Sequence, residues 1–216
     1  MSADWTLVTF CAAAYLIGSL PVGYWVTRWR RLGLDIRGYG SGNVGTANIY
    51  RHAGFALAAV VGPIQFVQGL LPVLLGRYVG SITGTGLVLI GIVAVVGNGW
   101  SLFLRFDGGR GVAVSTGAVA GLNLIALAVL LACFAAGALR GRIAEGVLAG
   151  FIVLPLAGVV LALTPLRAGW ALPVGLAVLL LLILARRLDG VVGDVNHFGP
   201  DSRGRRGHDP LRKQHS

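Results

Sequence analysis

Long apolar runs separated by short arginine-bearing loops constrain this chain more than any other feature. Of its 216 residues, 56% are hydrophobic and only 12% are charged, whereas soluble domains carry about a quarter charged residues. A soluble core of this size cannot bury so much apolar surface, so the chain requires a bilayer as part of its solvent. The pattern predicts an all-α fold, a polytopic transmembrane helical bundle.

The apolar segments can be delimited along the chain. Because a spanning helix needs about 20 apolar residues, we expect segments at 5–27, 55–76, 83–104, 146–163 and 169–185, with a kink at Pro21 in the first. The run 111–139 is too long for one upright helix and short for two, and Gly121, Leu122 and Asn123 are candidates for a turn within it. Residues 1–185 would form the transmembrane domain, and residues 186–216 a basic tail whose composition is typical of disorder toward its end.

The basic residues favour two helices in this run, which gives about seven spans. With the N-terminus outside, the cytoplasmic segments 28–54, 105–110, 140–145 and 186–216 hold 16 of the 18 Lys and Arg residues, and only Arg77 and Arg167 lie outside. A single helix over 111–139 would put the 140–145 loop and the basic tail outside. We therefore predict an outside N-terminus and a cytoplasmic C-terminus. The net charge of +10 indicates contact with anionic lipids rather than nucleic acid, since the arginines lie in short loops.

The first cytoplasmic loop is rich in glycine and reads G-Y-G-S-G-N-V-G-T-A-N-I-Y-R over residues 38–51. Closely spaced glycines permit positive φ values and allow backbone N–H groups to converge on an anion. Ser41 and Asn43 add side-chain donors, and arginine adds a fork that suits phosphate. A flexible linker is the alternative, but a linker has little need of this many Asn and Arg residues. The candidate phosphate ligands here are Gly40, Gly42, Gly45, Asn48, Arg37 and Arg51.

The second loop reads F-D-G-G-R-G-V-A-V over residues 106–114, where a helix is expected to begin. Gly108, Gly109 and Gly111 surround Arg110, and a glycine-rich turn before a helix N-terminus is suited to anions. A helix–helix turn whose arginine only sets the topology is the alternative. A G-K-S/T element and a preceding strand are absent, which excludes a nucleotide triphosphatase. Because both loops face one compartment, we expect them to bind two phosphates, or one molecule in two positions.

These motifs resemble those of the bacterial acyl-phosphate:glycerol-3-phosphate acyltransferase family. The family's first motif is G-S-G-N-x-G-A-T-N, and residues 40–48 read G-S-G-N-V-G-T-A-N. Its second motif is G-H-x-x-P followed by F-K-G-G-K-G-V-A-T, and residues 97–101 and 106–114 read G-N-G-W-S and F-D-G-G-R-G-V-A-V. The resemblance also covers G-S-L-P-V-G at 18–23 and extends over most of the chain.

The resemblance implies a reaction at the cytoplasmic face of the bacterial inner membrane. A fatty acyl group would pass from acyl phosphate to the 1-hydroxyl of glycerol 3-phosphate, giving lysophosphatidic acid for phospholipid synthesis. No cofactor and no metal are implied. By position in the motifs, Ser41, Asn43 and Arg110 would be catalytic, with Arg110 replacing the family's lysine and neutralising charge on the leaving phosphate.

The chain departs from the family pattern at several positions. Asn98 stands where the family has His, Ser101 where it has Pro, and Asp107 where it has Lys. Residues 185–188 read A-R-R-L in place of a third motif, H-R-x-N-I-x-R-L. Transfer to a hydroxyl needs a proton acceptor, and this leaves three candidates: the substrate's own phosphate, Asp107 and Glu145.

Two other functions are compatible with parts of the sequence. A non-catalytic paralogue that binds phosphorylated lipid precursors would explain Asp107 and the missing third motif. A small transporter is less favoured, because transport pathways are usually marked by ionisable residues inside the spans, and these spans contain essentially none. The sequence favours no particular oligomeric state.

Overall fold

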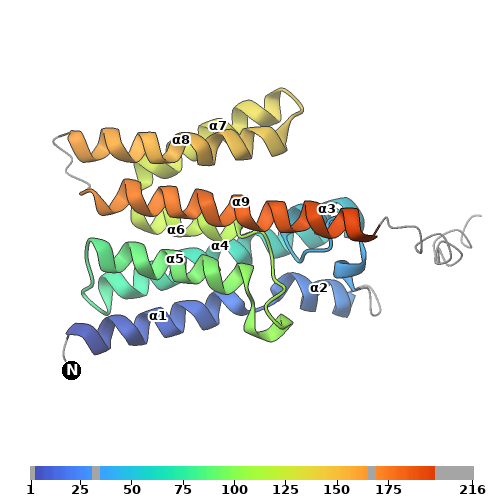
Figure 1. Cartoon of the computed structure of the whole chain (residues 1–216), viewed down its shortest axis with the longest axis horizontal. Helices are drawn as coiled ribbons and strands as arrows, with labels where there is room; N and C mark the ends of the chain where they lie inside the picture. The colour runs from blue at the N-terminus through green and yellow to red at the C-terminus, as the bar shows by residue number, and fades with distance from the viewer. Residues whose placement is uncertain (1–2, 31–34, 165–168, 198–216) are drawn as a thin grey trace, which may run out of the picture.

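The computed structural model describes residues 3–30, 35–164 and 169–197, and this part of the chain is helical throughout its regular structure (Figure 1). The elements are α1 (Ala3–Ser19), α2 (Val22–Arg30), the 3₁₀ turn η1 (Ile36–Gly38), α3 (Thr46–Ala53), α4 (Phe55–Tyr78), α5 (Thr85–Gly99), the 3₁₀ turn η2 (Leu102–Leu104), α6 (Val112–Leu122), α7 (Leu124–Leu139), α8 (Ile143–Leu163) and α9 (Ala171–His197).

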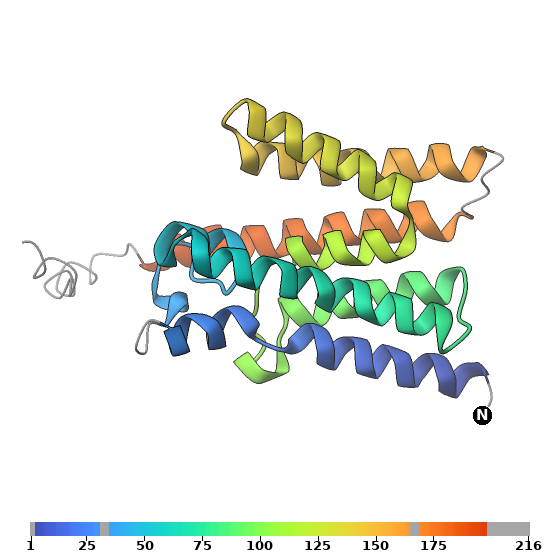
Figure 2. The same cartoon turned by 180° about the vertical axis from the view of Figure 1, so that it is seen from behind.

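The long helices lie side by side, and the chain reverses direction from each to the next (Figures 1 and 2). Within the described residues, five helical segments are long and apolar enough to cross a membrane, while α6 and α7 are shorter apolar helices. The expected all-α bundle is therefore observed. The end of the bundle that carries α2, α3 and the last turns of α9 also carries both glycine-rich loops; we call it the loop end.

The first span is broken where the sequence predicts a kink. Pro21 has no N–H to donate and separates α1 from α2. Gln68 of α4 compensates for the break, because its amide donates to the Ile17 carbonyl at 2.7 Å and to the Leu20 carbonyl at 3.0 Å. A buried polar side chain in an apolar helix thus satisfies backbone groups that the proline leaves without helical partners.

The run 111–139 forms two helices, as the basic residues predicted, and the break lies at Asn123. The Asn123 side chain accepts hydrogen bonds from the N–H groups of Ile125 and Ala126, which caps the start of α7. Arg77 of α4 donates to the Leu122 carbonyl at 3.1 Å and so satisfies the end of α6. The turn is therefore specified by its own sequence and by a neighbouring helix.

Small residues allow two helix pairs to pack backbone against backbone. A Cβ atom at either of two glycines in each pair would overlap a backbone carbonyl of the facing helix, and such contacts are typical of membrane helices. The contacts are Gly18 with Ala94 and Gly97 with Tyr15 between α1 and α5, and Gly69 with Val114 and Gly117 with Phe66 between α4 and α6. These four helices form the rigid part of the bundle that supports the loops.

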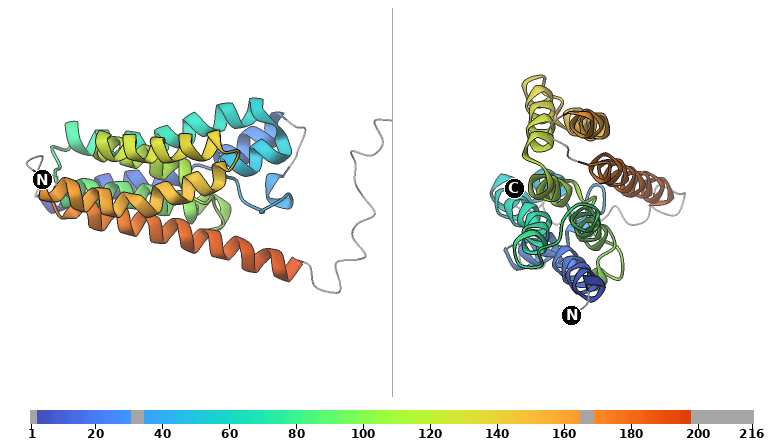
Figure 3. Two further views of the ribbon diagram at one scale, coloured as in Figure 1. Left: turned by 90° about the horizontal axis from the view of Figure 1, so that it is seen from above. Right: turned by 90° about the vertical axis from the view of Figure 1, so that its left-hand side faces the viewer.

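The hairpin of α7 and α8, which we call the outer hairpin, stands to one side of this core (Figure 3). Helix α8 packs against α7 and α9, and α9 in turn packs against α5. Helix α9 continues to His197, past residue 185 where the apolar segment ends. Residues 198–216, which include most of the predicted basic tail, lie outside the described residues.

Candidate functional site

The first loop is organised around the buried side chain of Asn48, which is 3% exposed. Its amide group lies within hydrogen-bonding distance of three loop carbonyls, those of Ile36 (3.3 Å), Tyr39 (3.0 Å) and Asn43 (2.9 Å). Its carbonyl oxygen accepts from the Ser41 N–H at 3.3 Å. Asn48 therefore shapes the loop from inside and does not point toward a ligand, although the sequence suggested it as a phosphate ligand.

Several other groups of the first loop also bond within the loop. The Gly42 N–H donates to the Tyr39 carbonyl at 3.1 Å, and the Gly45 N–H donates to the Asn43 side chain at 2.9 Å. Asn43 in turn donates to the Ser41 hydroxyl at 3.0 Å. A hydroxyl that accepts one bond still has its own hydrogen to donate. Ser41 is thus held in place by Asn43 and remains able to donate to an anion.

Gly40 requires glycine for two reasons. Its φ of +56° lies in the left-handed region, and a Cβ atom there would overlap the His52 ring and lie 2.6 Å from Oδ1 of Asn48. The backbone of the loop therefore packs directly against α3. Gly40 closes the loop onto this helix.

Arg37 already has a counter-ion. Its guanidinium binds both carboxylate oxygens of Asp35, at 3.0 and 2.8 Å, and lies 4.8 Å from the centre of the Tyr24 ring. The hydrogen bond with Arg37 is the largest cause that holds the pKa of Asp35 below its ordinary value. Nearby Asp107 of the second loop also helps to raise the pKa of Arg37, so the two loops approach each other at the loop end.

The second loop is docked on the end of α5 through its backbone. The Gly108 N–H donates to the Gly99 carbonyl at 3.1 Å, and the Gly109 N–H donates to the Asn98 carbonyl at 2.9 Å. A Cβ atom at position 108 would overlap the Asn98 carbonyl oxygen. These two N–H groups, expected to bind phosphate, are engaged in the structure, and the two glycines serve to bring the loop close to α5.

A residue that the sequence did not suggest fixes the other side of this loop. Arg186 of α9 lies 3.3 Å from the Asp107 carboxylate, 3.2 Å from the Gly108 carbonyl and 3.4 Å from the Gly109 carbonyl. Its guanidinium also lies 5.4 Å from the centre of the Trp100 ring. The available signal was the position of Arg186 in A-R-R-L, where a third family motif was expected, but that position does not indicate which residues Arg186 contacts.

The start of α6 is the part of the second loop that is open to an anion. Gly111 is the N-cap with a φ of +76° and provides no side-chain cap. Within the described residues, the backbone N–H groups of Val112 and Ala113 in the first turn of α6 have no hydrogen-bond acceptor. The Nε atom of Arg110 is buried and has no hydrogen-bond partner among the residues that the structure describes. Unsatisfied helix N–H groups beside a buried arginine are the features that a bound phosphate would satisfy.

Arginines from two helices, α3 and α9, lie near Arg110. Burial is the largest cause that lowers the pKa of Arg110, followed by the like charges of Arg187, Arg51 and Arg186. Arg51 comes from α3 and the other two from α9. This group, which we call the arginine cluster, brings together both predicted loops and the end of the last helix. Such a concentration of positive charge is stabilised by a multivalent anion.

The two carboxylates proposed as proton acceptors lie in different places. Asp107 borders the arginine cluster and pairs with Arg186. Glu145 lies in the first turn of α8, where it pairs with Arg142 at 2.8 Å, and both side chains are more than half exposed. Since α8 packs against α7 and α9, Glu145 is part of the outer hairpin and not of the two loops.

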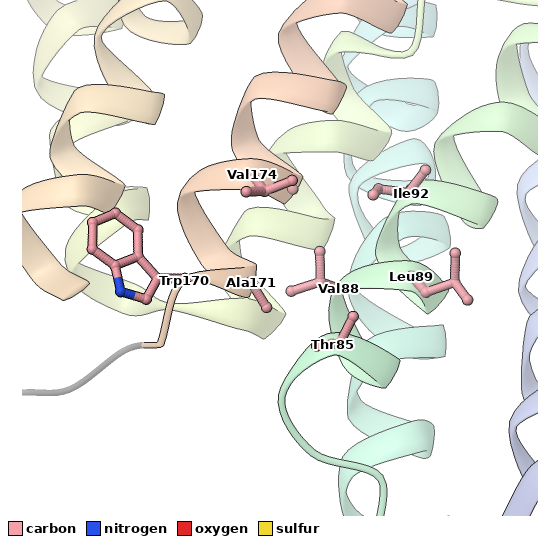
Figure 4. Close-up of a pocket in the computed structure, with 8 residues that line it drawn as sticks. Thr85, Val88, Leu89, Ile92, Trp170, Ala171 and Val174 are labelled. Carbon is pink, nitrogen blue, oxygen red and sulfur yellow. The ribbon is translucent and has the colours of Figure 1, made fainter.

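An apolar groove between α5 and the start of α9 lies at the opposite end of the bundle. It is lined by Val88, Leu89 and Ile92 of α5 and by Trp170 and Val174 (Figure 4). At about 1.5 Å per residue, the helical rise places Thr85 roughly 20 Å from Gly99 and the second loop. The groove is therefore separate from the polar site, and its lining suits hydrocarbon rather than phosphate.

The fold and the site define a class: a polytopic helical membrane protein with a basic site, suited to anions, between two glycine-rich loops. A sequence profile described as "Glycerol-3-phosphate acyltransferase" matches residues 8–190, and the chain belongs to this family.

Curated relatives and solved structures agree with this assignment. Glycerol-3-phosphate acyltransferase 5 of Dehalococcoides mccartyi is 36% identical over 68% of this chain and 63% of its own length. Glycerol-3-phosphate acyltransferase 4 of another strain of that species is 34% identical over 82% of this chain and 75% of its own length. The crystal structure of PlsY (YgiH), an integral membrane glycerol 3-phosphate acyltransferase, in its glycerol 3-phosphate form superposes with a TM-score of 0.74 at 25% identity, covering 91% of this chain and 92% of PlsY. Its lysophosphatidic acid form gives a TM-score of 0.70.

Proposed function

We propose that this protein transfers a fatty acyl group from acyl phosphate to the 1-hydroxyl of glycerol 3-phosphate and releases inorganic phosphate. The observation that carries the proposal is the open N-terminus of α6 beside Arg110, whose buried Nε has no partner. Both substrates are phosphorylated, and one has a lipid tail, so both suit a basic site at a membrane surface. The relatives' names support the same activity.

The reaction needs charge neutralisation more than it needs covalent chemistry by the protein. The hydroxyl oxygen forms the new ester bond at the acyl carbon, the bond from that carbon to the phosphate oxygen breaks, and phosphate leaves with the electron pair. Arg110 and the first turn of α6 stabilise the charge on this phosphate. Ser41, held by Asn43, donates its hydroxyl hydrogen to a substrate phosphate, and Arg51 adds charge from α3.

A phosphate oxygen of the substrate is the proton acceptor that we favour. The second pKa of a phosphate monoester is about 6, so it accepts a proton readily near neutral pH. Asp107 pairs with Arg186, and Glu145 pairs with Arg142 on the outer hairpin. Both carboxylates are therefore occupied by other partners, which leaves the substrate phosphate as the available acceptor.

For the membrane orientation we propose seven crossings, with the N-terminus outside and the loop end in the cytoplasm of a bacterium, at its inner membrane. The alternating course of the helices supports this, because it requires α6 and α7 to cross as well. The division of basic residues supports the direction, since 16 of the 18 Lys and Arg residues lie in the segments that the sequence assigns to the cytoplasm. The arginines of the tail would then face anionic lipid head groups.

The proposal is tested with purified full-length protein in phospholipid vesicles. We supply glycerol 3-phosphate with acyl phosphate, acyl carrier protein thioester or acyl-coenzyme A, and measure lysophosphatidic acid. We expect product from acyl phosphate alone, and a loss of about 10³-fold in kcat for Arg110→Ala, the magnitude of a lost transition-state charge contact. Arg142→Ala, which removes an exposed arginine from the outer hairpin, is the control with unchanged activity.

Two results would contradict the proposal. One is an absence of product from acyl phosphate at every chain length, with a thermal unfolding transition showing that the protein is folded. The other is binding of glycerol 3-phosphate, measured by calorimetry, without any turnover. The second result would favour a paralogue that binds phosphorylated lipid precursors without catalysis.

A further inference from the structure

Arg110 and Arg186 are neighbours with opposite environments. The Nε of Arg110 is buried, and within residues 3–30, 35–164 and 169–197 it has no hydrogen-bond partner. The guanidinium of Arg186, whose side chain is only 12% exposed, lies against two loop carbonyls and the Asp107 carboxylate and packs over Trp100. One arginine is therefore open to a ligand, while the other is used to hold the protein's own backbone.

The contacts of Arg186 complete the fixation of the second loop. The N–H groups of Gly108 and Gly109 are bonded to α5, and their carbonyls face the Arg186 guanidinium of α9. The peptide units just before Arg110 are thus tied to two different helices. Since Arg110 follows Gly109 directly, this arrangement sets the direction in which its side chain leaves the backbone.

Asp107 determines which task Arg186 performs. A guanidinium within reach of a bound phosphate would otherwise bind that phosphate, because the bidentate charged pair is the stronger interaction. The Asp107 carboxylate at 3.3 Å gives Arg186 a competing partner on the loop itself. A lysine at position 107, as in the family motif, would repel Arg186 from the loop.

Resting on the proposed acyl transfer, we propose that Arg186 is a positioning residue, held on the second loop by Asp107, that aims Arg110 and the start of α6 at the reacting phosphate. We call the contact of Arg186 with the second loop the clamp. Asp107 is then the counter-ion of this clamp and not the proton acceptor. The apparent charge reversal at position 107 is part of how this chain fixes the loop.

Kinetics of Arg186 variants separate positioning from direct binding. For Arg186→Gln we expect kcat to fall by about 100-fold, the size of effect that misplacement of a catalytic group causes, while KM for glycerol 3-phosphate changes by less than about threefold. Arg186→Lys restores part of kcat, because an ammonium keeps the charge but lacks the planar fork. A rise in KM with kcat retained would show that Arg186 binds the substrate phosphate directly, and would overturn the proposal.

Asp107 variants test the clamp and the proton acceptor together. Asp107→Lys should lower kcat by at least about tenfold through repulsion of Arg186, an effect of more than 1.4 kcal/mol. A gain in activity from this substitution would overturn the proposal. Asp107→Asn should lower kcat by only about two- to fivefold, as expected for a half-exposed ion pair, and should leave the acid limb of the pH–rate profile in place. Loss of that limb would identify Asp107 as the base and overturn the proposal.

A double-substitution cycle adds a test of coupling. If Asp107 acts through Arg186, the pair Asp107→Asn and Arg186→Gln should be no slower than Arg186→Gln alone. Multiplying effects would show that the two residues act independently and would overturn the proposal. The control is Arg142→Gln, which breaks an arginine–carboxylate pair of similar length on the outer hairpin.

One measurement is independent of turnover. We expect amide hydrogen exchange over residues 106–111 to be faster by about tenfold or more in Arg186→Gln than in the wild type, because the backbone bonds to α5 open more often. Unchanged exchange would overturn the clamp even in an active enzyme. If the wild type makes no product but the exchange difference is found, the clamp stands and the proposed reaction is wrong.

Discussion

The two glycine-rich loops are held in place by different means. The first loop is fixed by its own residues, since Asn48 bonds to three carbonyls and one N–H between positions 36 and 43. The second loop is fixed by residues on other elements, the end of α5 and Arg186 of α9. The first can therefore keep its shape by local interactions, while the second depends on how the helices pack.

This difference indicates a division of labour. Three of the groups suggested as phosphate ligands in the first loop, Asn48, Gly42 and Gly45, are engaged in loop hydrogen bonds, and Arg37 is paired with Asp35. This leaves Ser41, Arg51 and the Gly40 N–H to meet a ligand. In the second loop Gly108 and Gly109 are engaged, but Arg110 and the first turn of α6 are open. The packing of α5, α6 and α9 therefore controls the groups that face the reacting phosphate.

Removing the centre of the first loop should have the largest effect. Within the described residues, Asn48→Ala leaves the Asn43 carbonyl and the Ser41 N–H without a partner, and it leaves the Ile36 and Tyr39 carbonyls with one backbone partner each. Each group left unpaired costs about 1–3 kcal/mol where water cannot reach it. We expect kcat/KM to fall by about 10³-fold, which corresponds to roughly 4 kcal/mol. The measurement is lysophosphatidic acid formation in vesicles, together with the midpoint of thermal unfolding.

Asn43→Ala is the matched comparison within the same loop. It removes the bonds to Gly45 and Ser41 but leaves the Asn48 network in place. We expect a loss of about tenfold, from the roughly 1–1.5 kcal/mol of a hydrogen-bonded pair. Equal effects of the two substitutions would mean that Asn48 is not the centre of the loop.

A glycine-to-alanine substitution in each loop should give the next largest difference in activity between the two loops. In Gly108→Ala the new Cβ overlaps the Asn98 carbonyl, so the second loop must leave α5, and we expect about a 100-fold loss of kcat because Arg110 is displaced. In Gly42→Ala the nearest atom, the Arg37 carbonyl oxygen, is 3.4 Å away, and only the φ of +68° is unfavourable. That conformation costs about 1–2 kcal/mol for alanine, and we expect a loss of about fivefold to tenfold.

These two variants are compared by steady-state kinetics at saturating acyl phosphate. A greater loss for Gly42→Ala than for Gly108→Ala would contradict the close docking of the second loop. Gly141→Ala is a suitable control for the cost of a positive φ alone, since it has a φ of +68°, no atom within 4 Å and a place in the outer hairpin.

Much of the fold follows from local sequence. The break at Pro21 and the division at Asn123 were both predicted, because a missing N–H and a side-chain cap act within a few residues. Helix α3 was not predicted, because its eight residues, T-A-N-I-Y-R-H-A, lie among glycines and carry no long apolar pattern. It forms where Asn48 and Ile49 are buried under the loop, which is a tertiary effect.

In the candidate site, too, local features could be predicted from the sequence and tertiary contacts could not. The sequence identified both loops and Arg110, since clustered Gly and Arg are visible within a short window. It did not identify Arg186, because its contacts with Gly108 and Gly109 join residues more than 75 positions apart. It also did not distinguish glycines that donate to a ligand from glycines that let a loop approach a helix, because both uses require the same residue.

The ion pair of the first loop gives the smallest expected effect, and one that depends on pH. Arg37 holds the pKa of Asp35 below its ordinary value of 3.8. A lowered pKa in the folded state means that the unfolded chain binds the proton more tightly. The stabilisation by Asp35 is therefore present above about pH 4 and is lost as the pH falls through the folded-state pKa.

Asp35→Asn should accordingly be less stable than the wild type at pH 6, and the difference should shrink as the pH falls below 4. Because both side chains are about one-third exposed, we expect a difference below about 1 kcal/mol. Asparagine keeps an oxygen that can accept from the Arg37 N–H, so the 3₁₀ turn remains capped and only the charge is tested. Thermal unfolding at pH 6, 4 and 2 measures it, and a difference that does not shrink below pH 4 would show that the loop depends on the shape of Asp35 and not on its charge. A vanishing difference would mean that the charged pair of the first loop acts locally, as the Asn48 network does. The charged pair of the second loop, Asp107 with Arg186, instead joins separate elements.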